Sequence, residues 1–386
     1  MKKLNSQNKK VAVALSGGVD SGVAAALLIK EGYQCTGFHL HLWSESIKDK
    51  KFENKCCSTE SLEVARKTAH QLGMTFQVID FSQLFKKKVV DYFLKTYALG
   101  LTPNPCIFCN KFIKFGELLN YIRKLGFDYL ATGHYARIEA PKFAQKDCLY
   151  LLMGKDKSKD QSYFLYNLTQ CQLKHVLFSI GDYQKKEVVA LAKKWQLPVA
   201  TRPESQEICF LPEDDYRPFL KRHISSKIIP GEVVNIKGKM IGRHEGLPLY
   251  TIGQRHGFVI RTKNIEHRTK EIISPFYVIE KNVKKNQLIV GFGKETERKE
   301  FLVKDVNWID PNYPLSNSER IPHSGLINYP LFVKIRHQGG LLKAKVLVQK
   351  AKLRVILNEP ERGIAPGQAA VFCQGEEVLG GGIILI

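Results

Sequence analysis

The first 132 residues alternate short, β-rich apolar runs with stretches of helical periodicity, and this alternation restricts the fold more than any other feature. The runs predicted as strands are 11–15, 33–43, 75–81 and 128–132, with helices predicted over 21–30, 58–72, 84–97 and 110–125. Strands separated by helices of this length pair in parallel, because each helix crosses the sheet before the next strand begins. The pattern therefore predicts an α/β domain with a doubly wound parallel sheet.

The helical pattern continues through 185–195 and disappears after about Cys209. Beyond that point, short β-branched runs punctuated by Gly, Pro and Asn indicate a small all-β barrel or sandwich. Its predicted strands are 231–236, 249–252, 275–280, 287–291, 331–335, 343–347, 353–357, 369–372 and 381–386. We therefore expect an α/β domain over 1–207, a small central linker module over 208–275 and a C-terminal all-β barrel over 276–386.

The chain is strongly basic, with 59 Lys and Arg against 37 Asp and Glu and a formal net charge of +22. A surplus of this size is typical of proteins that bind a polyanion, either nucleic acid or an anionic membrane surface. The apolar runs are shorter than the ~18 residues of a membrane span. Asp20 also interrupts the apolar segment that follows the first lysines, unlike a secretion signal. We expect a cytoplasmic protein with a nucleic-acid partner and no membrane.

The segment 16–21, Ser-Gly-Gly-Val-Asp-Ser, lies between the first predicted strand and the first predicted helix. Glycines let the backbone turn tightly and present successive N–H groups to an anion, and the helix N-terminus adds partial positive charge. No G-x-x-x-x-G-K-[ST] motif occurs, so a Walker-type loop is excluded. The segment predicts a pyrophosphate-binding loop, with an ordinary glycine-rich turn as the alternative.

This loop resembles that of the PP-loop ATP pyrophosphatases, which cleave ATP between the α and β phosphates and transfer AMP to a poorly reactive oxygen. The resemblance implies an adenine nucleotide alpha hydrolase-like fold, with ATP and Mg²⁺ as cofactors. Two further contacts are expected, Leu40 and Gly133, because both lie at the carboxyl ends of predicted parallel strands, where an adenine would lie. Together the implied ATP contacts are Ala14, Leu15, Ser16, Gly17, Gly18, Val19, Asp20, Ser21, Leu40 and Gly133.

Nine cysteines, an odd number, favour thiol or metal chemistry over a disulfide framework. Cys106 and Cys109 follow two prolines, and we expect Asn110 to cap the next helix, with Cys109 at or just before the helix N-terminus, where the pKa of a thiol falls. Cys209 lies far downstream in Ser-Gln-Glu-Ile-Cys-Phe. A zinc knuckle is the alternative for the first pair, although it requires a second pair and Cys56–Cys57 are adjacent. Burial as ordinary apolar side chains is expected for the rest: Cys35, Cys148, Cys171 and Cys373.

Taken together, the motifs resemble the tRNA-specific 2-thiouridylases, which transfer sulfur to the wobble uridine. The matching segments are 16–21, 104–110, 131–135, 159–165, 208–210, 251–255 and 366–368 with 380–382. The resemblance implies that Cys109 is the nucleophile and that Cys209 carries a persulfide. It assigns the target base to Asn104, Pro105 and Cys106, and the tRNA to His134, Lys159, Asp160, Gln161, Arg336, His337 and Gln368.

The implied reaction adenylates the C2 oxygen of uridine and replaces it with persulfide sulfur, leaving a Cys109–Cys209 disulfide. The implied sulfur donor is a persulfide relay protein, ultimately fed by a cysteine desulfurase. Many family members carry Asp where this chain has Cys106, so an acid–base role there is vacant or altered. A [4Fe–4S] cluster held by Cys106, Cys109 and Cys209 stays open as an alternative. Two other functions also stay open: a PP-loop ligase acting on a small molecule, and a zinc-stabilised RNA-binding protein without catalysis.

Overall fold

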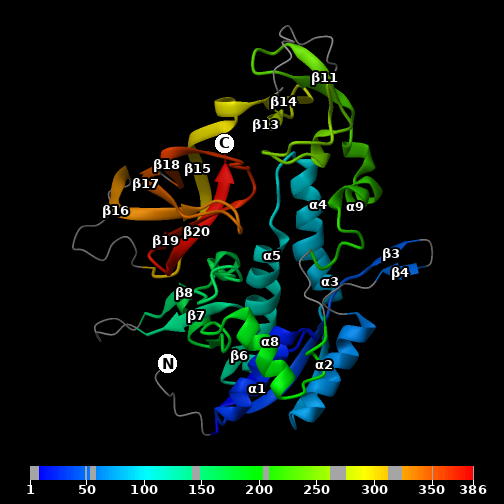
Figure 1. Cartoon of the computed structure of the whole chain (residues 1–386), viewed down its shortest axis with the longest axis vertical. Coiled ribbons are helices and arrows are strands. Elements are labelled where there is room, and N and C mark those ends of the chain that lie inside the picture. The colour runs from blue at the N-terminus through cyan, green and yellow to red at the C-terminus, as the bar shows by residue number, and fades with distance from the viewer. Residues whose placement is uncertain are drawn as a thin grey trace.

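The protein divides into three parts (Figure 1). The computed structural model describes residues 8–47, 50–52, 58–140, 148–202, 208–260, 275–311, 324–349 and 351–385. The N-terminal α/β part occupies the lower half of the view, the C-terminal barrel lies above it on the left, and the central module forms the top. None of the helices among these residues is long and apolar enough to cross a membrane.

The N-terminal part contains a five-stranded sheet in which every described pair is parallel, which confirms the predicted fold class. The strand order is β5-β2-β1-β6-β9, with β1 (Lys10–Ala14), β2 (Gln34–His41), β5 (Thr75–Asp80), β6 (Tyr129–Ala131) and β9 (Val176–Leu177). Val11, Ala12 and Val13 of the central strand are completely buried. Around the sheet lie α1 (Val19–Lys30), α2 (Thr59–Gln71), α7 (Gln170–Leu173) and α8 (Lys185–Lys194).

Two long helical runs follow β5, and both contain π-helical turns. The first comprises α3 (Ser82–Phe85), η1 (Lys86–Val90) and α4 (Asp91–Ala98). The second comprises α5 (Pro105–Phe108), the π-helical segment η2 (Cys109–Leu118) and α6 (Leu119–Lys124). Such wider turns are frequent at functional sites, and here one of them begins at Cys109.

The central module is a small sheet of order β12-β11-β10-β14-β13, approached through α9 (Tyr216–His223). Its strands are β10 (Gly231–Val234), β11 (Met240–His244), β12 (Val259–Ile260), β13 (Tyr277–Asn282) and β14 (Gln287–Gly291). Because β14 pairs with β10, this sheet continues to Gly291, beyond the boundary predicted at 275. The strand predicted over 249–252 is wrong: a 3₁₀ turn containing Pro248 occupies Leu247–Leu249, and Gly253 adopts a φ of 87° in the turn that follows.

The C-terminal part is a closed antiparallel barrel, as predicted. It contains β15 (Glu297–Trp308), β16 (Ser324–Lys334), β17 (Leu342–Gln349), β18 (Lys352–Arg362), β19 (Ala369–Gln374) and β20 (Glu377–Leu385). Pairing of β15 with both β18 and β20 closes the barrel.

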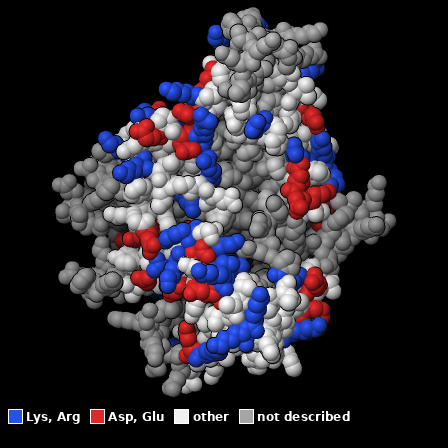
Figure 2. Space-filling view, in the orientation of Figure 1, with Lys and Arg blue, Asp and Glu red and all other residues white. Residues whose placement is uncertain are grey.

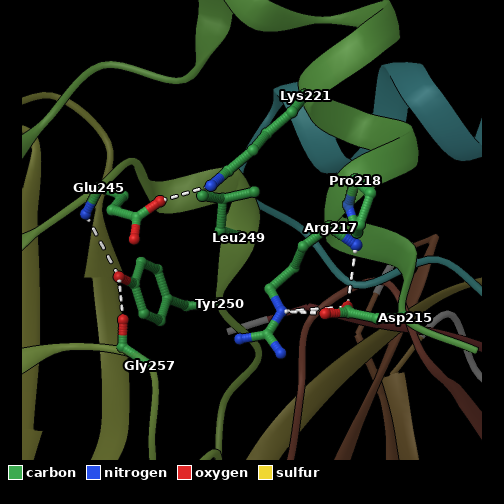
Figure 3. A pocket seen from close by; sticks show the side chains of 8 residues that line it. All are labelled: Asp215, Arg217, Pro218, Lys221, Glu245, Leu249, Tyr250 and Gly257. Atoms are coloured by element: carbon green, nitrogen blue, oxygen red, sulfur yellow. Dashed lines mark hydrogen bonds and ion pairs between the residues drawn. The ribbon is translucent and has the colours of Figure 1, made fainter.

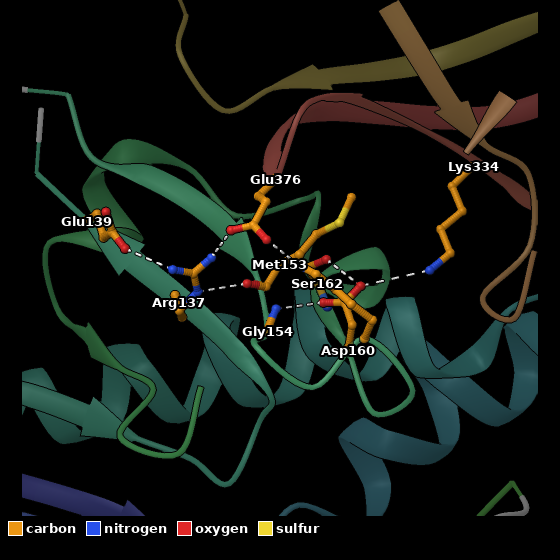
Figure 4. Close-up of polar contacts among 9 residues, drawn as sticks. Arg137, Glu139, Met153, Gly154, Asp160, Ser162, Lys334 and Glu376 are labelled. Carbon is orange, nitrogen blue, oxygen red and sulfur yellow. Dashed lines mark hydrogen bonds and ion pairs between the residues drawn. The ribbon is translucent and has the colours of Figure 1, made fainter. Parts of the chain in front are cut away.

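A hairpin from the N-terminal part extends this barrel. Strands β7 (Ala136–Glu139) and β8 (Tyr150–Met153) pair with each other, and β8 pairs with β20. The Arg137 side chain donates to the Met153 carbonyl at 2.9 Å and forms ion pairs with Glu139 and Glu376 (Figure 4). The sequence did not predict these strands, and their pairing joins the α/β part to the barrel.

Candidate active site

The loop between β1 and α1 has the geometry of an anion site. Gly17 adopts a φ of 75°, and a Cβ atom there would lie 2.4 Å from the Ser61 carbonyl oxygen, so only glycine fits. The Ser21 hydroxyl donates to the Gly18 carbonyl at 3.0 Å and accepts from the Ser16 N–H at 3.3 Å. The loop is thus closed on itself at the N-terminus of a 12-residue helix.

The predicted nucleotide contacts outside the loop lie at the ends of neighbouring strands. A Cβ atom on Gly133 would lie 2.6 Å from the Ser21 nitrogen, so the chain after β6 lies directly against the phosphate loop. Leu40, near the end of β2, packs between two hydrophobic clusters. The structure therefore brings Gly133 to the loop and Leu40 to the adjoining core, while their contact with ATP stays a prediction.

Charged residues that the sequence did not predict surround this loop. The Lys185 ammonium lies 2.8 Å from each carboxylate oxygen of Asp20, and the Tyr135 hydroxyl donates to the same carboxylate at 2.8 Å. The Arg202 guanidinium donates to the Gly17 carbonyl at 3.4 Å and to the Ser61 hydroxyl at 3.1 Å. Both cations come from α8 and the segment after it, which carry no recognisable phosphate motif.

The helix that carries Cys106 and Cys109 begins earlier than predicted. Asn104 is its N-cap, with its side chain accepting from the Ile107 N–H at 3.4 Å, and Pro105 is the first helical residue. The predicted cap, Asn110, instead lies inside the helix and donates to the Phe164 carbonyl at 3.3 Å. The prediction that Cys109 lies at or just before the N-terminus of a helix capped by Asn110 is therefore wrong, because the helical run already begins at Pro105. Cys106 instead occupies the first turn, where a helix favours a thiolate.

The two predicted reactive cysteines pack on one hydrophobic cluster, built around Phe85, Phe93, Phe210 and Phe219. Cys109 and Cys209 are both half-buried against this cluster, and Leu40 packs on it as well. Cys106 is exposed. Cys109, Cys209 and Leu40, which are far apart in the sequence, therefore pack against the same hydrophobic cluster.

The remaining cysteines differ in environment. Burial raises the pKa of Cys35 and of Cys373 to about 12, which makes both thiols unreactive at neutral pH. Cys148 is half-buried, whereas Cys171 is exposed and so departs from the burial we expected. Cys56 and Cys57 lie outside the described residues. Across the described ranges, no three His, Cys, Asp or Glu side chains are placed to hold a metal ion.

Gln368, a predicted tRNA contact, lies against the segment that precedes the target-base residues. Its side-chain amide donates to the carbonyls of Thr102 at 3.3 Å and Pro103 at 3.0 Å, while the Thr102 N–H donates to the Pro366 carbonyl at 2.8 Å. At Gly367, φ is 93° and a Cβ atom would lie 2.8 Å from the Thr102 oxygen. The barrel thus supports the start of the cysteine segment directly.

Asp160 and its neighbours form a second contact between the α/β part and the barrel (Figure 4). The buried Asp160 carboxylate accepts from Gly154 N–H at 3.0 Å and from the Ser162 hydroxyl at 3.0 Å, and it lies 3.8 Å from the Lys334 ammonium. Gln161 accepts from the Tyr135 N–H at 3.1 Å. Asp160 is therefore a structural anchor for the end of β16, whereas Lys159 is half-buried beside it.

The other predicted tRNA residues occupy distinct environments. Arg336 is exposed and contacts Glu361 at 3.2 Å, and the His337 ring lies 4.4 Å from the Phe164 ring. Burial, aided by the Lys334 charge, lowers the His337 pKa. Burial also holds the pKa of His134 well below its ordinary value, with Lys114 adding to the effect. His134 is almost completely enclosed and contacts the Thr132 hydroxyl at 2.7 Å.

Three buried polar atoms where the α/β part meets the barrel have no hydrogen-bond partner among the described residues. They are Thr102 Oγ1, Asn110 Oδ1 and His337 Nδ1. Thr102 contacts Gln368, while Asn110 and His337 both contact Phe164. Buried polar atoms are costly to leave unpaired, so this junction offers hydrogen-bonding groups to a ligand.

Basic side chains on the face shown in Figure 2 are densest along its middle, where the α/β part meets the barrel. A separate cavity of about 230 Å³ lies in the central module (Figure 3). Its charged lining is already paired, through Lys221 with Glu245 at 2.6 Å and Arg217 with Asp215 at 2.8 Å. None of the sequence-predicted site residues lines that cavity.

Comparison with known proteins covers nearly the whole chain. Family models match residues 9–213 (tRNA methyl transferase HUP domain), 217–292 (tRNA methyl transferase PRC-barrel domain) and 298–384 (Aminomethyltransferase beta-barrel domain). The tRNA-specific 2-thiouridylase MnmA of Carboxydothermus hydrogenoformans is 41% identical over 379 residues, which is 97% of each chain. That of Symbiobacterium thermophilum is 42% identical over 385 residues, covering 97% of this chain and 92% of the relative. That of Roseiflexus castenholzii is 42% identical over 388 residues, covering 97% and 99%. The chain belongs to the tRNA-specific 2-thiouridylase family.

Proposed function

We propose that this chain catalyses the ATP-dependent 2-thiolation of the wobble uridine of tRNA, as a tRNA-uridine 2-sulfurtransferase. The observation that carries the proposal is the packing of Leu40, Cys109 and Cys209 against one hydrophobic cluster. This shared cluster supports the proposal, because adenylation followed by sulfur transfer requires a nucleotide site near two reactive cysteines. Methyl transfer, named in the family descriptions, requires neither a phosphate loop nor a cysteine pair.

The first step activates a weak electrophile. The C2 carbonyl of uridine is urea-like and has no leaving group, so its oxygen attacks the α-phosphorus of ATP and pyrophosphate leaves. The N–H groups of the phosphate loop and the N-terminus of α1 stabilise the leaving pyrophosphate. Mg²⁺ bound together with ATP would supply further charge neutralisation.

The second step replaces AMP with sulfur by one of two routes. In one, the outer sulfur of a Cys209 persulfide attacks C2 and AMP leaves, and the Cys109 thiolate then attacks the Cys209 sulfur to release the thiocarbonyl. In the other, Cys109 attacks the persulfide first and releases hydrosulfide, which displaces AMP. Both routes form a Cys109–Cys209 disulfide, which an external thiol reductant must reopen by transferring two electrons. The persulfide would come from a relay protein fed by a cysteine desulfurase.

Cys106 lies in the first turn of α5. A [4Fe–4S] cluster on Cys106, Cys109 and Cys209 is the alternative to the disulfide chemistry, and no step above runs through it. Iron and acid-labile sulfide in active, anaerobically purified protein would support the cluster, whereas colourless, fully active protein would exclude it.

The target uridine is proposed to bind at the junction of the Asn104–Cys106 turn with the barrel. Chemistry on C2 requires the base to leave its stack, and buried polar groups then read its edges. Thr102, Asn110 and His337 each present such a group. Lys159, Arg336 and the surrounding basic surface are proposed to hold the tRNA backbone.

The test is genetic complementation. The gene is deleted and complemented with the wild type, Cys109→Ser or Cys209→Ser, and 2-thiouridine in bulk tRNA is measured by mass spectrometry. Cys171→Ser, at an exposed thiol outside the cysteine cluster, serves as the matched control and should rescue fully. Unchanged thiolation in the deletion strain, or full rescue by either of the first two variants, would overturn the assignment.

A further inference from the structure

We propose that Lys185 is a positioning residue of the phosphate loop, which neutralises Asp20 so that the loop can accept the pyrophosphate group of ATP. The loop itself carries no lysine, unlike a Walker motif, and the cation arrives from a helix far along the chain. This inference rests on the proposed function, because it assigns a role within the same ATP site.

The contact between the two side chains is close and sheltered. The Lys185 ammonium lies 2.8 Å from both Asp20 oxygens, and the exposed fractions of the side chains are 17% for Lys185 and 27% for Asp20. The Tyr135 hydroxyl occupies a further position on the carboxylate, at 2.8 Å. Three donor contacts therefore hold Asp20 in one orientation, and limited exposure reduces solvent screening of the pair.

The position of Asp20 explains why it needs a cation. Asp20 is the second residue of α1, in the first turn of the helix, where the proposed pyrophosphate site lies. A helix N-terminus carries only about half a positive elementary charge, so an unpaired carboxylate would more than cancel it. Paired with Lys185, the carboxylate leaves the local field favourable to pyrophosphate.

The backbone of α8 is fixed in a way that suits this role. The Lys185 N–H donates to the Asp156 carboxylate at 2.9 Å, and a capping box between Gln184 and Glu187 begins the helix. Val188 and Ala192 of α8 are buried in the same cluster as Val23 of α1. The helix that supplies the cation is thus packed against the helix that carries Asp20.

Lys186 provides a matched control. It is the next residue of α8, carries the same charge and is exposed. General electrostatic attraction of ATP would depend on both lysines alike, whereas the proposed role belongs to Lys185 alone.

The experiment measures binding of Mg²⁺ and the α,β-methylene analogue of ATP to the full-length protein by calorimetry. Lys185→Gln should weaken binding by about tenfold or more, Lys185→Arg should bind within about threefold of wild type, and Lys186→Gln should match wild type. In an Asp20→Asn background, adding Lys185→Gln should change affinity by less than about twofold, because no carboxylate is left to neutralise. In thiolation assays, Lys185→Gln should raise the KM for ATP and leave the KM for tRNA unchanged.

Wild-type affinity in Lys185→Gln would overturn the inference. An equal loss in the Asp20→Asn background would overturn it too, because Lys185 would then act on the phosphates directly. If Lys185→Gln alone fails to fold, the double variant Asp20→Asn/Lys185→Gln is used instead, because it leaves no unpaired carboxylate at position 20. Its affinity for the analogue is then compared with that of Asp20→Asn. Failure of the wild type to bind the analogue contradicts the proposed function instead.

Discussion

Replacing Gln368 with leucine tests whether the barrel positions the target-base segment. The substitution keeps the side-chain size and removes the donors to Thr102 O at 3.3 Å and Pro103 O at 3.0 Å. Each bond contributes about 0.5–1.5 kcal/mol, and the longer one lies at the weak end, so the loss is about 1–2 kcal/mol. If this free energy holds Asn104–Cys109 in its reactive position, kcat falls by roughly five- to thirtyfold.

The assay compares single-turnover thiolation, tRNA affinity and thermal unfolding for Gln368→Leu and wild type. A positioning role lowers kcat and lowers Tm by about 2–4 °C, with the tRNA Kd unchanged. Gln374→Leu is the control, since Gln374 is exposed at the end of β19 in the same barrel. Weaker tRNA binding at unchanged kcat would refute the reasoning and support the prediction that Gln368 contacts tRNA directly.

Three further predictions follow from the geometry. Gly17→Ala places a Cβ atom 2.4 Å from the Ser61 oxygen at a residue with a φ of 75°. It should lower the free energy of unfolding by about 2–4 kcal/mol and abolish ATP binding. Wild-type affinity for ATP measured by calorimetry would contradict this prediction. Burial depresses the pKa of His134 in the folded protein, so its contribution to stability is present above the ordinary histidine pKa and is lost as pH falls toward the folded value. His134→Gln should therefore flatten the decline of Tm below about pH 6.5. A decline of Tm equal to that of the wild type would contradict this prediction. The logarithm of tRNA affinity should fall linearly with the logarithm of salt concentration, by roughly 0.7–0.9 per phosphate contact, and a flat dependence in filter-binding titrations would exclude the basic face as the tRNA surface.

The parallel sheet was predictable because local periodicity is enough to identify its strands and helices. The apolar run Val11–Ala14 predicts a buried strand. The glycine-rich segment that follows it predicts the tight turn between this strand and the next helix. Most strands of the central module and of the barrel were predictable as strands for the same reason. The sheet to which each strand belongs was not predictable, because a pairing such as that of β14 with β10 in the central module joins residues far apart along the chain.

The sequence motifs of the candidate active site could be recognised, but the residues that surround them in the fold could not be predicted. Cys109 and Cys209 stand in recognisable segments, but their packing against the same hydrophobic cluster is a tertiary feature that no local pattern predicts. The helix start was misjudged because Asn110 is as good a capping residue as Asn104, and only Pro105 distinguishes the two. Lys185 has no local signal at all, since a lysine that begins an amphipathic helix is ordinary on a protein surface.

The pairing of β8 with β20 joins the α/β part to the barrel through the main chain. A fragment that ended before the barrel would keep the pairing of β8 with β7 but would leave the opposite edge of β8 open, and an open edge can recruit strands from other molecules. The same hairpin begins at Ala136, one peptide bond after the tyrosine that holds Asp20. One continuous segment of the chain therefore joins the strand that pairs with the barrel to the side chain that orients Asp20 in the nucleotide loop.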